Sequence, residues 1–155
     1  MINFKLNQTN FNHLKTEYKV IPVTLSNFMD YRDLINSSIK NFKSELDWES
    51  LFTLDDAYQR LNEGMIMYIG MVDFEVFGHV WFKNHNDGRF LFNLFVRNQV
   101  EDKKYTGKEF LSDVIFRFEN NKTIYCEVDE WNTKSLRLFE RLGFNDEINK
   151  FDLIF

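Results

Sequence analysis

The chain has 155 residues, of which 44% are hydrophobic and 17% aromatic, enough for one domain with a sizeable core and too many for a disordered chain. A formal net charge of −5 argues against an electrostatic grip on nucleic acid or an anionic membrane, and favours an amine-bearing partner. The single cysteine, Cys126, excludes an internal disulfide and a zinc site built from cysteines.

The N-terminal segment lacks the basic flank and apolar run of a secretory signal. No apolar stretch approaches the roughly 20 residues that a membrane-spanning helix needs. We therefore expect a cytoplasmic protein with neither a membrane nor a nucleic acid as partner.

The N-terminal third predicts a strand and two helices, preceded by an arm or a short edge strand. Residues 1–18 are polar and rich in asparagine, and they are expected to form an arm or a short edge strand of a single domain spanning residues 1–155. A strand ending at Val23 follows, and then a helix that Ser26 or Asn27 would cap. Residues 53–64 predict a second helix, with acidic residues in its first turn and Gly64 just past its end.

The middle of the chain predicts three strands. Residues 65–72 are continuously apolar, which is typical of a strand buried on both faces. Residues 77–82 form the next strand, and Asp87 with Gly88 suits a hairpin turn. In the third strand alternation places Phe90, Phe92, Leu94 and Val96 on one face, and Leu91, Asn93 and Phe95 on the other.

The C-terminal part predicts a helix, a strand, a helix and a closing strand or pair of strands. Residues 107–121 carry one apolar stripe at helical spacing, and residues 123–128 read as a strand. Asn132 would cap the last helix, and Gly143 would end it. The fold class is therefore α/β, with a mixed, mostly antiparallel central sheet flanked by helices.

Residues 126–144, "CEVDEWNTKSLRLFERLGF", together with the order of elements, resemble the GNAT superfamily of acyl-CoA N-acyltransferases. The spacing of Asn132, Ser135 and Arg137 ahead of Gly143 is most similar to the branch of ribosomal-protein N-terminal acetyltransferases. The resemblance covers residues 19–155. It implies a GNAT-like fold and acetyl-CoA-dependent transfer of an acetyl group to a primary amine: a protein N-terminus, an amino sugar or a polyamine.

The resemblance also implies where acetyl-CoA would bind. Its pyrophosphate would lie on the loop and helix start at Lys103, Lys104, Tyr105, Thr106, Gly107 and Lys108, where backbone N–H groups and cations meet an anion. Its pantetheine arm would run along the backbone of Leu94, Phe95 and Val96, with Asn132 on the other side.

Amide formation requires a base for the amine and an acid for the leaving thiolate. Glu127 is the candidate base, with Asn93 and His79 as weaker candidates, and Ser135 is the candidate acid. Glu45, Trp48 and Asn93 are candidate acceptor-binding residues, because carboxylates attract a cationic amine and a tryptophan packs on its stem. No metal is expected, since the histidines lack metal-ligand spacing.

Three departures from the family pattern leave an alternative open, the first being a loop from Val96 to Lys104 that is about three residues longer than usual. Phe139 stands where many relatives have a tyrosine acid, and Glu109 stands where the cofactor loop has a small residue. These residues favour a non-catalytic GNAT-like binding module with weak or no CoA binding. The oligomeric state is open, and a homodimer is one possibility.

Overall fold

The computed structural model describes residues 2–6, 19–45, 52–72, 75–97, 107–120, 122–129 and 131–146. The elements of these ranges are β1 (Ile2–Leu6), β2 (Lys19–Val23), α1 (Arg32–Glu45), α2 (Leu54–Asn62), β3 (Ile66–Val72), β4 (Glu75–His85), β5 (Gly88–Val96), α3 (Gly107–Phe118), β6 (Thr123–Val128), α4 (Thr133–Arg141) and β7 (Asn145–Asp146). Their order along the chain is the one that the sequence predicts.

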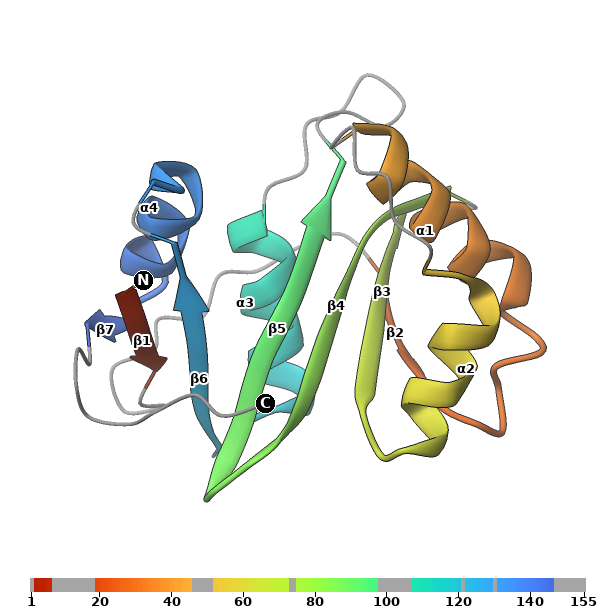
Figure 1. The fold of residues 1–155 in the computed structure, drawn as a ribbon, viewed down its shortest axis with the longest axis horizontal. Coiled ribbons are helices and arrows are strands. Elements are labelled where there is room, and N and C mark those ends of the chain that lie inside the picture. Colours follow the sequence, from red (N-terminus) through yellow and green to blue (C-terminus); the bar gives the residue numbers. More distant parts are fainter. Residues whose placement is uncertain are drawn as a thin grey trace.

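The strands form one seven-stranded sheet in the order β2-β3-β4-β5-β6-β1-β7 (Figure 1). Every pair is antiparallel except β5 with β6, which run parallel. The expected mixed, mostly antiparallel sheet is therefore confirmed. Residues 2–6 were expected in an arm or an edge strand, but β1 is an interior strand, because it pairs with β6 on one side and β7 on the other.

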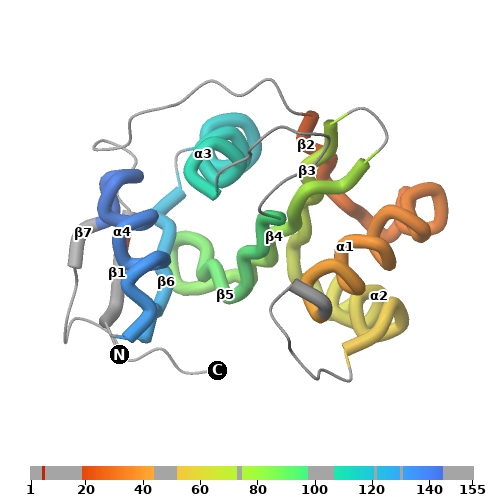
Figure 2. The backbone as a smooth tube through the Cα atoms, turned by 90° about the horizontal axis from the view of Figure 1, so that it is seen from above, coloured from red at the N-terminus to blue at the C-terminus, as the bar shows by residue number. Residues whose placement is uncertain are grey.

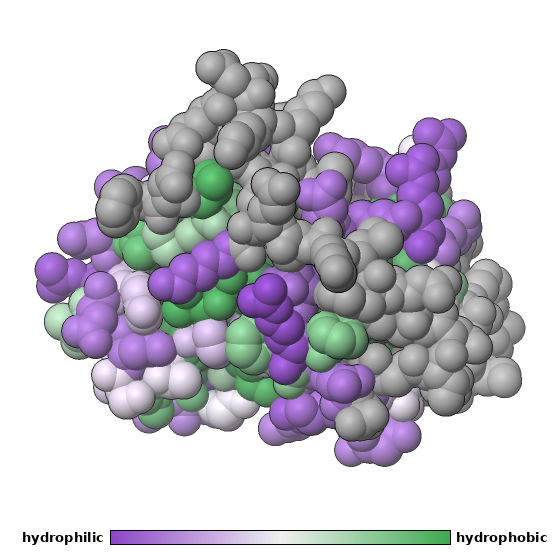
Figure 3. All heavy atoms as spheres, turned by 180° about the vertical axis from the view of Figure 1, so that it is seen from behind, coloured by the Kyte–Doolittle hydropathy of each residue, from purple (hydrophilic) through white to green (hydrophobic). Residues whose placement is uncertain are grey.

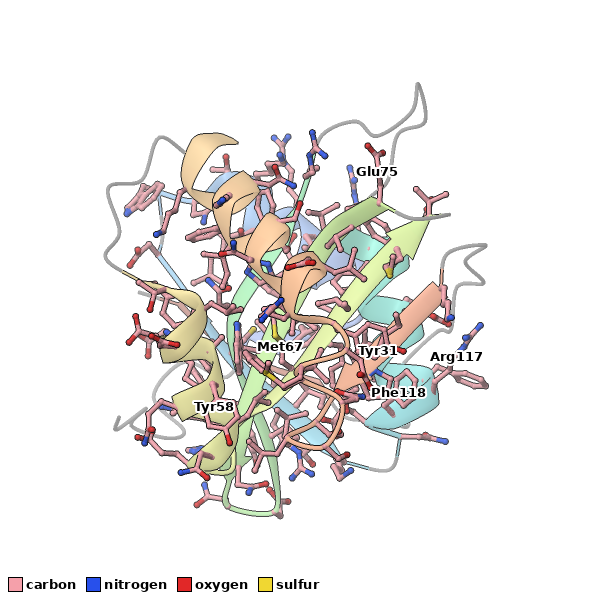
Figure 4. All side chains as sticks on the ribbon, turned by 90° about the vertical axis from the view of Figure 1, so that its right-hand side faces the viewer. Tyr31, Tyr58, Met67, Glu75, Arg117 and Phe118 are labelled. Atoms are coloured by element: carbon pink, nitrogen blue, oxygen red, sulfur yellow. The ribbon has the colours of Figure 1, made fainter. Side chains whose placement is uncertain are left out.

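Helices cover both faces of the sheet (Figure 2). On one face α1 and α2 enclose a core that includes Ile35, Ala57 and Met67. On the other face α3 and α4 enclose a second core that includes Phe110 and Phe139. Seen from the β2 side, α1 and α2 lie on the face of the sheet opposite to α3 (Figure 4). The outer surface on the α3 side shows apolar side chains between polar and charged ones (Figure 3). The sheet is thus buried on both faces, as the apolar run of β3 predicts.

The first helix begins later than its sequence predicts. Residues 25–31 form turns, and α1 starts at Arg32. The predicted cap residue Asn27 closes a turn instead: its Oδ1 accepts from the backbone N–H of Thr24 at 2.7 Å, and its own N–H donates to Thr24 Oγ1 at 3.2 Å. This local bonding competes with a helix start, which explains the delay.

The last turn of α4 ends as predicted. Gly143 has a φ of 94°, a conformation that costs glycine little, and the Phe144 N–H donates to the Phe139 carbonyl at 2.9 Å. The chain turns back at this point, which buries Phe144 against Phe139 in the core on the α3 and α4 face.

The alternation predicted for residues 90–96 is wrong in its second half. Trp81 pairs with Asn93 and Phe82 with Leu91, so Phe92 is an extra residue in β5. Phe92 and Phe95 consequently face the α1 and α2 side, whereas Leu94 packs on the α3 and α4 side. The hairpin before this strand also differs, because Asn86 and Asp87 form its loop and Gly88 already belongs to the strand.

Candidate functional site

The sheet opens between its two parallel strands. β5 and β6 pair from Gly88 with Thr123 to Leu91 with Cys126, and the described residues beyond that point are not paired with each other. Figure 1 shows the two strands diverging toward the end where α3 begins. At the paired end the backbones are very close, because a Cβ on Gly88 would lie 1.9 Å from the Thr123 carbonyl oxygen. The bulge at Phe92 follows directly after the last paired residue.

The N-terminus of α3 lies beside this opening. A Cβ placed on Gly107 would lie 3.1 Å from Leu138 Cδ2 on α4 and 3.8 Å from Leu94 Cδ2 on β5. The first N–H groups of a helix have no partner within the helix, and its dipole attracts anions there. Lys108 follows in the first turn and is half-buried. The predicted residues Lys103, Lys104, Tyr105 and Thr106 lie outside the described residues.

The open edge of β5 consists of the residues predicted to bind the pantetheine arm. Leu94, Phe95 and Val96 lie past the last pair with β6, so their backbone groups on that side have no partner in a described strand. Across the opening, Asn132 caps α4, with its Oδ1 accepting from the Ser135 N–H at 3.2 Å. The structure therefore brings Leu94, Gly107 and α4 together.

The side chains of α4 have unequal access to this opening. Ser135 is half-buried in the first turn of the helix. Phe139, one turn further, is 4% exposed and lies in the core against Phe144. The position of residue 139 on α4 is therefore occupied by a phenyl ring that packs in the core.

A second feature is a cavity of about 130 Å³ on the α1 and α2 side of the sheet. It is lined by Ile39, Phe42, Lys43, Phe52, Arg60, His79, Trp81 and Asn93. Asn93 was predicted to bind the acceptor, and it lies two residues past the last β5–β6 pair. Of the other two predicted acceptor residues, Trp48 lies outside the described residues, and only the backbone of Glu45 is described.

A chain of buried hydrogen bonds crosses the wall of this cavity. His79 Nδ1 lies 2.6 Å from Ser38 Oγ, and His79 Nε2 lies 3.0 Å from Asn93 Oδ1. Because the amide oxygen can only accept, Nε2 carries the proton and Nδ1 accepts from the serine hydroxyl. Burial lowers the pKa of His79 to about 4, while the bond to Asn93 opposes the shift and the charge of Arg60 adds to it. His79 is therefore neutral at pH 7, with both ring nitrogens engaged, and it is not suited to be the base.

Glu127 lies at the start of the opening but outside the cavity lining. It follows Cys126, the last β6 residue paired with β5, and it is half-buried. Its neighbours Cys126 and Val128 belong to the core on the α3 and α4 face. The alternation of a strand puts Glu127 on the other face, the face to which Asn93 also points.

Sequence reasoning did not identify Ser38, Lys43, Arg60 and Trp81 as parts of a site. Arg60 sits between Asp56 and Glu63 on α2, a spacing that predicts ordinary helix-surface ion pairs. Arg60 packs against β4 and β5 through contacts between residues far apart in the chain, and no local sequence pattern predicts such contacts.

Two features are absent from the described part of the chain. It contains no helix long and apolar enough to cross a bilayer. It also contains no group of three histidine, cysteine, aspartate or glutamate side chains that could hold a metal ion.

Solved structures share this fold at low sequence identity. A GNAT-family acetyltransferase from Bacillus cereus ATCC 10987 matches with a TM-score of 0.61 at 16% identity, over 89% of this chain and 91% of the other. An aminoglycoside acetyltransferase from an uncultured soil metagenomic sample, in complex with trehalose, matches with a TM-score of 0.60 at 11% identity, over 89% and 96% of the two chains. Ribosomal-protein-alanine N-acetyltransferase from Brucella melitensis biovar Abortus 2308 matches with a TM-score of 0.56 at 13% identity, over 90% and 100%.

One further structural match is a longer protein. The chain spans 57% of the length of a functionally unknown conserved protein from Staphylococcus epidermidis ATCC 12228, with a TM-score of 0.58 at 12% identity. A comparison with curated proteins returned no match. The opened mixed sheet and the structural matches together define the fold of the acyl-CoA N-acyltransferases.

The family follows from the sequence itself. Residues 30–144 match the Acetyltransferase (GNAT) family, and these residues include both strands of the opening, α3 and α4. The chain belongs to the GNAT acetyltransferase family.

Proposed function

We propose that the protein is an acetyl-CoA-dependent N-acetyltransferase that acts on a primary amine. The observation that carries this proposal is the opening between β5 and β6 with the start of α3 beside it. An unpaired strand edge offers hydrogen bonds to an extended arm with amide groups, and a helix N-terminus offers N–H groups to a pyrophosphate. Family membership agrees with this use of the site.

Apart from Glu109, an acidic residue in the first turn of α3, the described residues beside the opening fit acetyl-CoA. Leu94, Phe95 and Val96 would hold the pantetheine arm through their backbone, and Gly107 would let the pyrophosphate approach the helix backbone closely. Lys108 supplies a cation in the first turn, and Asn132 borders the other side. When bound, acetyl-CoA supplies a thioester whose acetyl group an amine can accept.

The roles of the chain's own residues follow from the same arrangement. We assign to Glu127 the acceptance of the proton that the attacking amine loses, directly or through a water molecule. We assign to the Ser135 hydroxyl a hydrogen bond to the departing sulfur. Glu127 is the β6 residue directly after the last pair with β5, and Ser135 is in the first turn of α4, which follows β6 in the chain.

The cofactor site is tested by Gly107→Glu. The new carboxylate would stand at the helix start and repel a pyrophosphate, so we expect calorimetric titration with acetyl-CoA to show at least a hundredfold weaker binding. The added Cβ meets only the end of the Leu138 side chain, so the thermal melting curve should change little. Ser37→Glu, on the exposed surface of α1, makes the same charge change and should leave binding unaltered. Equal affinity in wild type and Gly107→Glu would remove this site.

The chemical roles are tested by Ser135→Ala and Glu127→Gln. We expect each to lower kcat in a thiol-release assay by about a hundredfold to ten-thousandfold, the typical contribution of one proton-transfer group, while the calorimetric Kd for acetyl-CoA stays within twofold. An unchanged kcat would dismiss that residue from catalysis. Loss of cofactor binding in step with kcat would give it a structural role instead.

A second candidate is a non-catalytic GNAT-like binding module. It is favoured by Phe139, which fills with a buried phenyl ring the position where many relatives have a tyrosine acid. A broad panel of amines separates the two. Cofactor binding without thiol release on any amine supports the module, and release on one amine supports the enzyme.

A further inference from the structure

We propose that the acceptor amine also carries a carboxylate or a similar anionic group, which Arg60 binds in the cavity beneath α1 and α2. This inference rests on the proposed function, because it names the class of acceptor. It also departs from the expectation that acidic residues attract a purely cationic substrate.

Arg60 lacks the ion pairs that its position on α2 would normally provide. Asp56, four residues earlier, is used by the helix cap, where its Oδ2 accepts from the Thr53 N–H at 2.8 Å. Glu63, three residues later, accepts from Gln59 Nε2 at 3.1 Å. No described carboxylate lies within ion-pair distance of the Arg60 guanidinium. Its charge is therefore available to a ligand.

Aromatic rings hold the guanidinium at the cavity. Its central carbon lies 4.1 Å from the ring centre of Phe52, 5.1 Å from that of Trp81 and 5.2 Å from that of Phe92. Rings bind the flat faces of a guanidinium, whereas a carboxylate binds along its N–H edge. These cation–π contacts place the Arg60 guanidinium among the rings and do not use its N–H groups, which keep their capacity for a bidentate ion pair.

The remaining polar groups of the described lining are donors. Lys43 adds a second cation from α1. The Oδ1 of Asn93 accepts a hydrogen bond from His79, so the NH₂ group of Asn93 remains as a donor for a ligand. The described lining residues include no aspartate or glutamate. Two cations and an amide donor around one cavity complement an anion and would repel a cationic amine that had no anionic group.

The volume of the cavity limits the size of the group that it can bind. About 130 Å³ corresponds to roughly four water volumes, enough for a carboxylate and a short stem. Asn93 belongs both to this lining and to the unpaired part of β5. An acceptor anchored through its anionic group would thus direct its amine toward the opening.

The test compares three amines of similar length: β-alanine, 2-aminoethylphosphonate and n-propylamine. We measure binding of each to the cofactor-free protein by calorimetry, and kcat/KM by thiol release. We expect β-alanine to exceed n-propylamine by at least tenfold in both measurements. In Arg60→Met, which keeps an apolar chain against the rings, this preference should fall to near one. Arg60→Lys should restore part of it, because the charge returns without the bidentate geometry.

Arg32→Met is the matched control, since Arg32 is an exposed arginine at the start of α1 that pairs with Asp33. It should keep the full preference, and thermal melting should show that both variants fold. A preference for 2-aminoethylphosphonate that also depends on Arg60 identifies a phosphonate or phosphate group as the anion. Transfer to n-propylamine and β-alanine at equal rates overturns this inference and leaves the proposed function standing. Absence of transfer to any amine, with acetyl-CoA bound, contradicts the proposed function, and Arg60-dependent binding of β-alanine then still supports the anion site.

Discussion

At the scale of single residues, His79 shows how burial converts a titratable group into a structural one. Its ring has less than a twentieth of its surface exposed (3%) and bonds to Ser38 on α1 and Asn93 on β5. These bonds join a helix to two neighbouring strands at the wall of the cavity. Protonation of Nδ1 would reverse the direction of the bond with the serine hydroxyl and place a charge in a buried site, so the neutral ring is part of the folded structure.

This arrangement predicts a pH dependence of stability. The folded pKa of about 4 lies below the ordinary value of 6.5, so between these values the unfolded chain binds more protons and stability falls as the pH falls. From pH 7 to pH 5 this group should cost about 2 kcal/mol of unfolding free energy. Urea denaturation of His79→Gln should show a loss smaller by that amount.

His85→Gln is the control for this experiment. His85 is more exposed, and its pKa is lowered by partial burial and by Lys83. Its substitution should change the pH dependence less than that of His79. A His79→Gln variant that loses as much stability on acidification as wild type would mean that His79 does not titrate in this way.

At the scale of elements, the contact between β5 and β6 decides the shape of the site. The strands approach so closely at Gly88 that only a residue without a side chain fits beside Thr123. A few residues later the bulge at Phe92 redirects β5, and the pairing ends. The strands β5 and β6 are thus in close contact at Gly88 and are no longer paired beyond Leu91 and Cys126.

Gly88→Ala should therefore be strongly destabilising. The new Cβ would collide with the backbone oxygen of Thr123, and we expect a loss of about 3 kcal/mol or more in urea denaturation. Gly64→Ala provides the comparison, because Gly64 has open space around it but a φ of 92°. It should lose only about 1–2 kcal/mol. Similar losses in the two variants would show that the close strand contact is not required.

The order of elements could be predicted from the sequence, because it depends on local signals. Gly64 and Gly143 end helices through backbone conformation, and the spacing of apolar residues in 107–118 reveals α3. The bulge at Phe92 could not be predicted, since it is defined by which residue of β4 each residue of β5 faces. The late start of α1 depends on a competing turn at Thr24.

The same distinction between local signals and long-range packing applies to the candidate site. Leu94, Gly107 and Asn132 carry signals within their own segments, and the structure brings their elements together. The cavity forms only where α1, α2, β4 and β5 meet, and no local pattern in the sequence around Arg60 indicates this long-range packing.

At the scale of the whole molecule, one buried carboxylate joins distant parts of the chain. Glu119, at the end of α3, accepts from Tyr68 Oη of β3 at 3.1 Å and from Lys122 Nζ at 3.1 Å, and it lies 3.4 Å from Arg89 Nε of β5. Burial and the nearby carboxylate raise the pKa of Tyr68, which keeps its hydroxyl protonated as a donor.

Glu119→Gln should lower stability substantially. The variant leaves the charges of Arg89 and Lys122, whose side chains are 20% and 35% exposed, without their counter-ion, and we expect a loss of about 2–3 kcal/mol, below the roughly 3–5 kcal/mol of a fully buried pair. Asp33→Asn removes an exposed ion pair with Arg32 and should cost at most about 1 kcal/mol. Denaturation curves of the two variants check this. A loss in Glu119→Gln no larger than in Asp33→Asn would contradict the linking role of Glu119.

The interior position of β1 has a consequence for biosynthesis. Ile2 pairs with Val128 and Leu6 with Ile124, so β1 is synthesised well before the strand with which it pairs. Contacts between such distant segments slow folding, because a very long loop must close before they form. Until then the β1 side of β6 is uncovered, and an uncovered strand edge invites pairing between nascent chains. The pairing of β1 must therefore wait until β6 has been synthesised.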